Sequence, residues 1–65
     1  MNTKFIKAAV KEIRTCAEDN ETAHALEDEL YINVLQAISE GAENAKELAT
    51  EALKAIEVKF TRWYA

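Results

Sequence analysis

The side chains best suited to chemistry in this 65-residue chain are one histidine, one cysteine and three consecutive carboxylates. His24 and Cys16 are eight residues apart, and a thiol beside an imidazole can act as a nucleophile. Cys16, however, ends an apolar stripe and His24 begins a second helical pattern, so we interpret them as a packing thiol and a surface imidazole. No second cysteine or histidine exists to complete a zinc site.

The three carboxylates, Glu27, Asp28 and Glu29, could suggest a metal site or an acid–base pair. Successive residues of a helix point about 100° apart, so these side chains diverge, and we interpret them as a solvated acidic face. A glycine-rich phosphate loop is also absent, because the chain has one glycine. The sequence therefore predicts no catalytic residue, no metal ligand and no cofactor.

The composition predicts an all-α protein, because good helix formers dominate and there is no proline. Residues 3–18 form an amphipathic pattern with an apolar stripe and an opposite basic face. The apolar stripe consists of Phe5, Ile6, Ala9, Val10, Ile13 and Cys16. The basic face consists of Lys4, Lys7, Lys11 and Arg14. The segment "AEDNET" interrupts this pattern. Asp19 or Asn20 could cap a new helix there, although one continuous bent helix also fits.

A second helix is predicted over residues 22–40, with apolar side chains on two sides. Its main apolar face consists of Ala23, Leu26, Leu30, Val34, Ala37 and Ile38, flanked by Tyr31. Ile32 and Leu35 project elsewhere, and a helix that is apolar on two sides usually has two neighbours. The second neighbour of this helix is then the tail or another subunit.

The next turn contains Gly41, which can take the left-handed conformation that ends a helix. Asn44 and Glu47 resemble a capping box for a third helix at about 45–56. The inward face of that helix is predicted to consist of Ala45, Leu48, Ala49, Ala52, Leu53 and Ile56. In the tail, residues 57–65, the letters "IEVKF" alternate as in a strand. We favour a bend followed by a helical turn, and leave the extended form open.

The tail holds three of the five aromatic residues, a type that is enriched in interfaces. Only 18 residues are large aliphatic or aromatic side chains, and a chain this short buries a modest share of its surface. We therefore predict one domain, a helical hairpin or small bundle that homodimerisation completes. The predicted partner or dimer interface consists of Ile32, Leu35, Phe60, Trp63 and Tyr64.

Charge is distributed unevenly along the chain, whose net charge is −4. Residues 1–14 carry +3, residues 15–52 carry −9 and residues 53–65 carry +2, so basic ends could complement an acidic middle. The basic face could instead bind a membrane surface or an acidic partner, but we favour a solvated face. The lone cysteine, the lack of a signal-peptide pattern and the lack of a long apolar run predict a cytoplasmic protein without a membrane span.

The stretch "VLQAISEGAENAKELATEAL" resembles the start of a helix-turn-helix unit, which makes a small DNA-binding transcription-related protein the alternative function. A recognition helix should follow, but the chain continues "KAIEVKF" and ends. Residues 40–57 also carry five acids and two lysines, which repel phosphates. We therefore do not expect nucleic acid as a partner. A third option is an acidic mimic that occupies a nucleic-acid-binding protein through Glu27, Asp28 and Glu29.

The segments "ALEDELYINVLQAI" and "FTRWYA", with the glycine turn between them, resemble small early-region proteins of lambda-like temperate bacteriophages. The resemblance covers roughly the last two thirds of the chain and includes no catalytic motif. It implies a protein that acts on the host or on the choice between lysis and lysogeny. Together with the composition, it predicts a non-enzymatic interaction module that binds itself and a host or phage protein.

Overall fold

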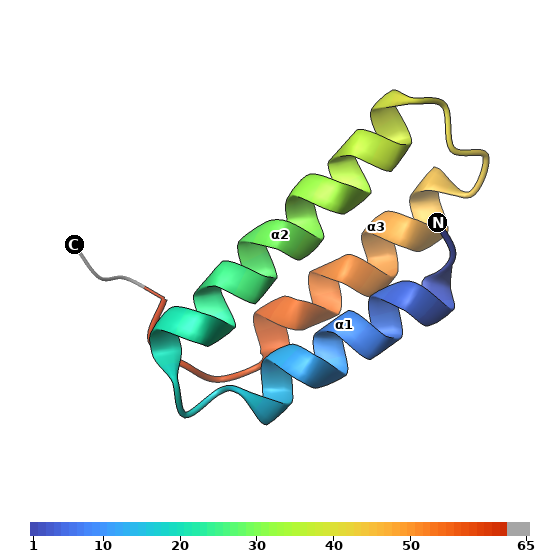
Figure 1. Ribbon diagram of the computed structural model, residues 1–65. Coiled ribbons are helices and arrows are strands. Elements are labelled where there is room, and N and C mark those ends of the chain that lie inside the picture. The colour runs from blue at the N-terminus through green and yellow to red at the C-terminus, as the bar shows by residue number, and fades with distance from the viewer. Residues whose placement is uncertain (63–65) are drawn as a thin grey trace.

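Three α-helices and one short 3-10 helix make up the fold of this chain, for which a computed structural model describes residues 1–62. The helices α1 (Thr3–Thr15), α2 (Asn20–Ser39) and α3 (Ala45–Leu53) alternate in direction, and each packs against the other two (Figure 1). The 3-10 helix η1 (Lys54–Glu57) continues from α3. The described part of the chain contains no strand, which confirms the all-α small bundle; the homodimer stays a prediction.

α1 and α2 are separate helices, because the chain turns sharply after Thr15 instead of continuing to residue 18. In this turn the backbone N–H of Asp19 donates to the Cys16 carbonyl at 2.9 Å. The Asp19 carboxylate caps α2 by accepting from the backbone N–H of Thr22 at 3.1 Å and from its hydroxyl at 2.9 Å. These hydrogen bonds favour the charged carboxylate and lower the pKa of Asp19.

Gly41 ends α2 as the sequence predicts, with a φ of +93°. The backbone N–H of Gly41 donates to the Ile38 carbonyl and that of Ala42 to the Ala37 carbonyl, which is the Schellman arrangement. The predicted capping box at α3 is wrong. The Asn44 side chain makes no capping hydrogen bond, and the φ and ψ of Asn44 (−99° and 36°) lie outside the extended conformation usual for a capping residue.

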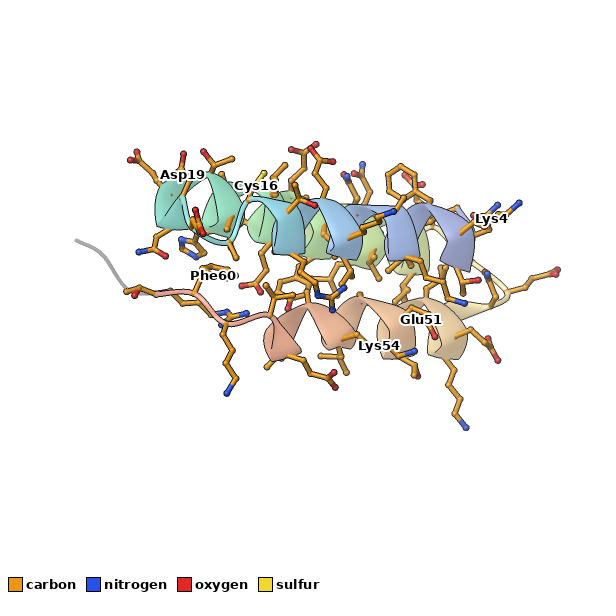
Figure 2. The ribbon with its side chains drawn as sticks, turned by 90° about the horizontal axis from the view of Figure 1, so that it is seen from below. Lys4, Cys16, Asp19, Glu51, Lys54 and Phe60 are labelled. Atoms are coloured by element: carbon orange, nitrogen blue, oxygen red, sulfur yellow. The ribbon has the colours of Figure 1, made fainter. Side chains whose placement is uncertain are left out.

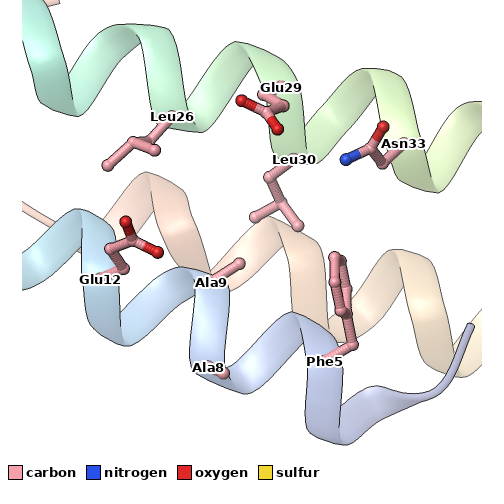
Figure 3. Close-up of a pocket in the computed structure, with 8 residues that line it drawn as sticks. All are labelled: Phe5, Ala8, Ala9, Glu12, Leu26, Glu29, Leu30 and Asn33. Atoms are coloured by element: carbon pink, nitrogen blue, oxygen red, sulfur yellow. The ribbon is translucent and has the colours of Figure 1, made fainter.

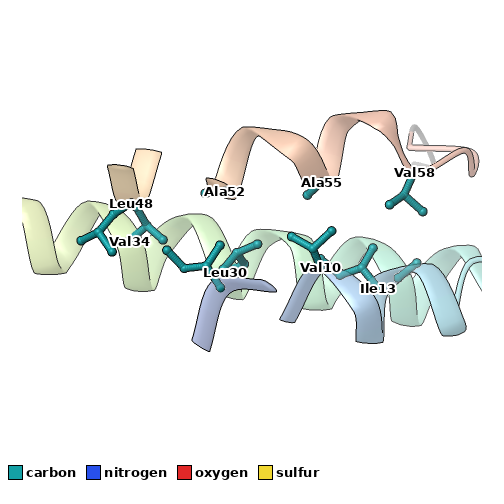
Figure 4. Close-up of a cluster of buried hydrophobic side chains, with 10 residues drawn as sticks. Val10, Ile13, Leu30, Val34, Leu48, Ala52, Ala55 and Val58 are labelled. Atoms are coloured by element: carbon teal, nitrogen blue, oxygen red, sulfur yellow. The ribbon is translucent and has the colours of Figure 1, made fainter. Parts of the chain in front are cut away.

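The core lies on the common axis of the three helices (Figure 4). Its buried apolar side chains are Ile6, Val10, Ile13, Ala23, Leu30, Val34, Leu48, Ala52, Ala55 and Val58. Three residues predicted to face inward, Phe5, Leu53 and Ile56, are instead more than half exposed. The predicted stripes are wider than the contact between neighbouring helices, so only the centre of each stripe is covered.

The tail leaves η1 in an extended conformation at Val58, whose side chain is buried. The expected helical turn after a bend is absent from residues 58–62. The backbone N–H of Thr61 donates to Asn20 Oδ1 at 3.1 Å, which holds the tail against the start of α2. Figure 2 shows Phe60 pointing from the tail toward the turn between α1 and α2. No helix formed by residues 1–62 combines the length and apolar character needed to cross a membrane.

Candidate protein-interaction surface

The acidic segment of α2 does not form one solvated face, which corrects the interpretation drawn from the sequence. Asp28 and Glu29 are exposed, but Glu27 is buried, with 4% of its surface accessible. Glu27 lies one turn after Ala23 and three residues before Leu30, so helical geometry directs it into the core. No group of three or more metal-binding side chains forms among the residues that the structure describes.

A counter-charge for Glu27 comes from Arg62, 35 residues further along the chain. The guanidinium Nε lies 3.1 and 3.2 Å from the two carboxylate oxygens, and its NH2 group donates to one of them at 3.0 Å. The same nitrogen lies 2.9 Å from the Ala55 carbonyl oxygen and 2.8 Å from the Val58 carbonyl oxygen, so its two hydrogens are shared among these acceptors and Glu27. The carbon at the centre of the guanidinium lies 4.2 Å from the centroid of the Phe60 ring.

This pair stabilises the charged form of the guanidinium, and its hydrogen bond to Glu27 raises the pKa of Arg62. Because Arg62 binds α2, the end of α3 and the tail together, it fixes the path of the chain after η1. Sequence reasoning missed the pair. The sequence does contain one indication of it, because Glu27 is the single acid on the apolar face of the second helix. Three cations follow Leu53, however, and only the folded structure shows that Arg62 is the one that pairs with Glu27.

Tyr31 lies one turn after Glu27 on α2, and its hydroxyl oxygen is buried. That oxygen makes no short hydrogen bond among residues 1–62, but the Glu27 carboxylate lies near enough to interact with the hydroxyl group. Burial, and secondly the negative charge of Glu27, raise the pKa of Tyr31 above its ordinary value of 10.0. The phenol therefore stays neutral at physiological pH, and its ring forms one end of an apolar groove.

This groove runs between α2 and the line formed by α3 and η1, and its volume is about 260 Å³. The lining residues are all uncharged and are Tyr31, Val34, Leu35, Ile38, Ala49, Ala52, Leu53 and Ile56. Val34 and Ala52 are buried and form the floor. Leu35 on one side, and Leu53 and Ile56 on the other, form the rims and are 65%, 58% and 59% exposed.

Ile32 does not line the groove, but it lies one turn before Leu35 on the outer side of α2, next to the rim, and is 63% exposed. We refer to the groove with Ile32 as the α2–α3 apolar face. The structure thus places two predicted interface residues, Ile32 and Leu35, on one surface and adds Leu53 and Ile56 to it. Phe60 is half-buried against the core instead, and Trp63 and Tyr64 lie outside the described residues.

The basic side chains predicted on α1, Lys4, Lys7, Lys11 and Arg14, are all exposed. Two of them, Lys7 and Arg14, border a shallow depression whose other side is formed by Glu51, Lys54 and Glu57. Lys54 is paired with Glu51 at 3.0 Å. Carboxylates of the α3–η1 segment therefore face part of the basic surface, which reduces the positive potential available to an outside partner.

A second hollow lies on the surface between α1 and α2 and is shown in Figure 3. Ala8 and Ala9 leave space on α1, and Phe5 bounds one end. Two carboxylates, Glu12 and Glu29, line this hollow, whereas no charged group lines the α2–α3 groove. Burying a carboxylate against an apolar partner is costly, so the α2–α3 apolar face is better suited to a protein contact.

His24 and Cys16, the other side chains considered for chemistry, lie next to residues of their own helices. His24 Nε2 lies 3.4 Å from Asp28 Oδ1, one turn further along α2. Cys16 is half-buried where α1 ends.

Comparisons with protein-family models, curated proteins and solved structures find no match to this chain. The α2–α3 apolar face is therefore the feature from which we infer a function.

Proposed function

We propose that this chain is a non-enzymatic interaction module that binds another polypeptide through the α2–α3 apolar face. The observation that carries the proposal is the concentration of three large, mostly exposed aliphatic side chains around one groove, namely Leu35, Leu53 and Ile56, with exposed Ile32 next to its rim. Scattered exposed apolar residues are normal on soluble proteins, but an apolar patch gathered around a groove is typical of an interaction site.

The shape of the face favours a helical partner. A groove between two helices accepts the apolar side of an amphipathic helix, whose side chains at positions i, i+3 and i+4 enter it in a row. The uncharged lining means that such a partner needs aliphatic or aromatic anchors and no buried counter-charge. The resemblance to early-region phage proteins suggests a host or phage protein in the bacterial cytoplasm as the partner.

The arrangement of the acidic side chains supports the non-enzymatic part of the proposal. Glu27, the most buried carboxylate of its segment, is held by Arg62 in a pair that fastens the tail. Asp28 and Glu29 point to solvent on separate sides of α2. A catalytic carboxylate pair requires convergent groups with separated pKa values, and these carboxylates do not converge.

Site-specific photo-crosslinking inside producing cells tests this proposal. A photoreactive phenylalanine analogue replaces Leu35 in one variant and Phe5 in a control, because Phe5 is also large, apolar and half exposed but lies on α1. We expect position 35 to give a defined adduct with a protein other than this chain, distinguishable by mass from a crosslinked second copy, and position 5 to give none. The purified partner should then bind Leu35→Glu at least tenfold more weakly than the original chain, because a charge would enter the apolar contact.

Equal affinity for the original chain and Leu35→Glu would refute the proposed surface. A mobility-shift assay with duplex DNA at several salt concentrations tests the alternative function. Strong binding that weakens steeply with salt would favour a DNA-binding role for the basic residues of α1.

A further inference from the structure

The α2–α3 apolar face has ridges and a hollow of matching chemistry. Leu35 stands out from α2, whereas Ala49 and Ala52 leave a depression on the facing side of α3. A leucine side chain is the kind of knob that fits a depression floored by alanine and valine. The surface therefore carries both halves of a knob-into-hole contact.

A two-fold axis parallel to the helices would form this knob-into-hole contact twice, once in each direction. It places α2 of one copy over α3 of the other, so that Leu35 of each copy enters the hollow at Ala49 and Ala52 of its partner. Such a reciprocal contact, in which residue i meets j and j meets i, defines an isologous dimer interface. We propose that a second copy of this chain occupies the α2–α3 apolar face in this arrangement.

The size of the face agrees with a dimer that forms and dissociates. The α3–η1 segment has a length of about 21 Å, and two neighbouring helices together are about 20 Å wide. Two faces in contact thus cover at most about 800 Å² in projection, because the full width of the two helices includes their outer sides. A specific interface needs roughly 1,000 Å² in total, so this contact belongs to the weak class.

No charged group of the groove lining would be buried by the contact. A dimer of this kind also closes on itself, because each copy presents one such face and uses it once.

The inference rests on the proposed function in that self-association and partner binding use the same face. The free protein would then be a reservoir in which two copies cover each other's apolar surface until a partner displaces one.

Sedimentation equilibrium of the purified chain, from about 5 μM to about 1 mM, tests the dimer. We expect the mass to rise from the monomer value of 7.3 kDa toward twice that value over this range. Leu35→Glu should stay at the monomer mass throughout, whereas Phe5→Glu should follow the original chain. Because both positions are more than half exposed, the variants should keep the helical circular dichroism of the original.

Complementary charges test the reciprocal arrangement. Leu35→Glu and Ala49→Lys should each be monomeric alone and should form a heterodimer when mixed, since one glutamate then meets one lysine across the axis. A monomer mass for the original chain at 1 mM, or dimers of Leu35→Glu as strong as those of the original, would overturn the inference. In that case the proposed function still stands if the crosslinked partner binds the original chain and not Leu35→Glu.

Discussion

The pair formed by Glu27 and Arg62 should be the polar contact on which the stability of this domain depends most. Arg62→Ala removes the guanidinium and leaves Glu27 buried, with 4% of its surface accessible, and without its counter-charge. Removing one partner of a fully buried ion pair costs about 3–5 kcal/mol. The Arg62 side chain is 34% exposed, so water can partly replace it, and we expect a loss of about 2–3 kcal/mol.

Glu27→Leu changes the same site in the opposite way. A leucine fits the apolar surroundings of Ala23 and Leu30, and Arg62 can turn toward water, so the expected loss is about 1 kcal/mol or less. In the double variant no charge is left buried. Its stability should match that of Glu27→Leu, which gives a coupling free energy of about 2–3 kcal/mol between the two residues.

Thermal and urea unfolding, followed by far-ultraviolet circular dichroism, measures these differences. In a domain of this size, 1 kcal/mol corresponds to about 4–8 °C in Tm, so Arg62→Ala should unfold about 10–20 °C earlier than the original chain. Lys59→Ala is the matched control, because Lys59 is a base in the same tail whose side chain is exposed. It should change the unfolding free energy by less than about 0.5 kcal/mol.

Additive losses in the double variant would refute this reasoning, because they would mean that Arg62 acts through its carbonyl contacts and not through Glu27. Arg62→Lys separates charge from geometry. Lysine keeps the positive charge but cannot donate to Glu27 and to the carbonyls of Ala55 and Val58 from one planar group. Its stability should lie between those of the original chain and Arg62→Ala.

Further predictions concern three single positions. Tyr31→Phe should raise the free energy of unfolding by up to about 1 kcal/mol, because it removes a buried hydroxyl that makes no short hydrogen bond among the described residues, and urea titration would contradict this if the variant were less stable. The raised pKa of Tyr31 means that its ionisation favours unfolding, so the original chain should lose stability as pH rises above 10 and Tyr31→Phe should lose less. Gly41→Ala should cost about 1 kcal/mol through backbone strain alone, since φ is +93° and no atom outside Gly41 and its two chain neighbours lies within 4 Å of the added methyl group; an unchanged Tm would argue against the left-handed turn. The lowered pKa of Asp19 means that the charged cap stabilises the fold at pH values above the ordinary pKa of 3.8 and loses this effect as pH falls through the lower pKa of the folded state. Asp19→Asn keeps a capping oxygen without the charge. The free energy of unfolding between pH 6 and 2 should therefore depend less on pH in this variant than in the original chain.

The sequence alone determined the helical class and most of the local structure. Helix-forming composition without proline, together with the spacing of Ile6, Val10 and Ile13, specifies an amphipathic first helix with a defined inner side. Gly41 marked the turn correctly, and Asp19 was one of two candidates for the cap that the structure contains. These features depend on residues within a few positions of each other, so periodicity and side-chain chemistry are sufficient to predict them.

The tertiary structure decided which edge of each stripe is covered and which long-range pair forms. Leu53 and Ile56 continue the apolar pattern of α3, yet they stay exposed because the bundle covers only the line through Leu48, Ala52 and Ala55. The local sequence predicts that Glu27 is one of three solvated acids. Only the path of the chain after η1 brings Arg62 to Glu27. Local patterns fix the direction of a side chain around its own helix, whereas burial depends on the positions of the other helices and the tail.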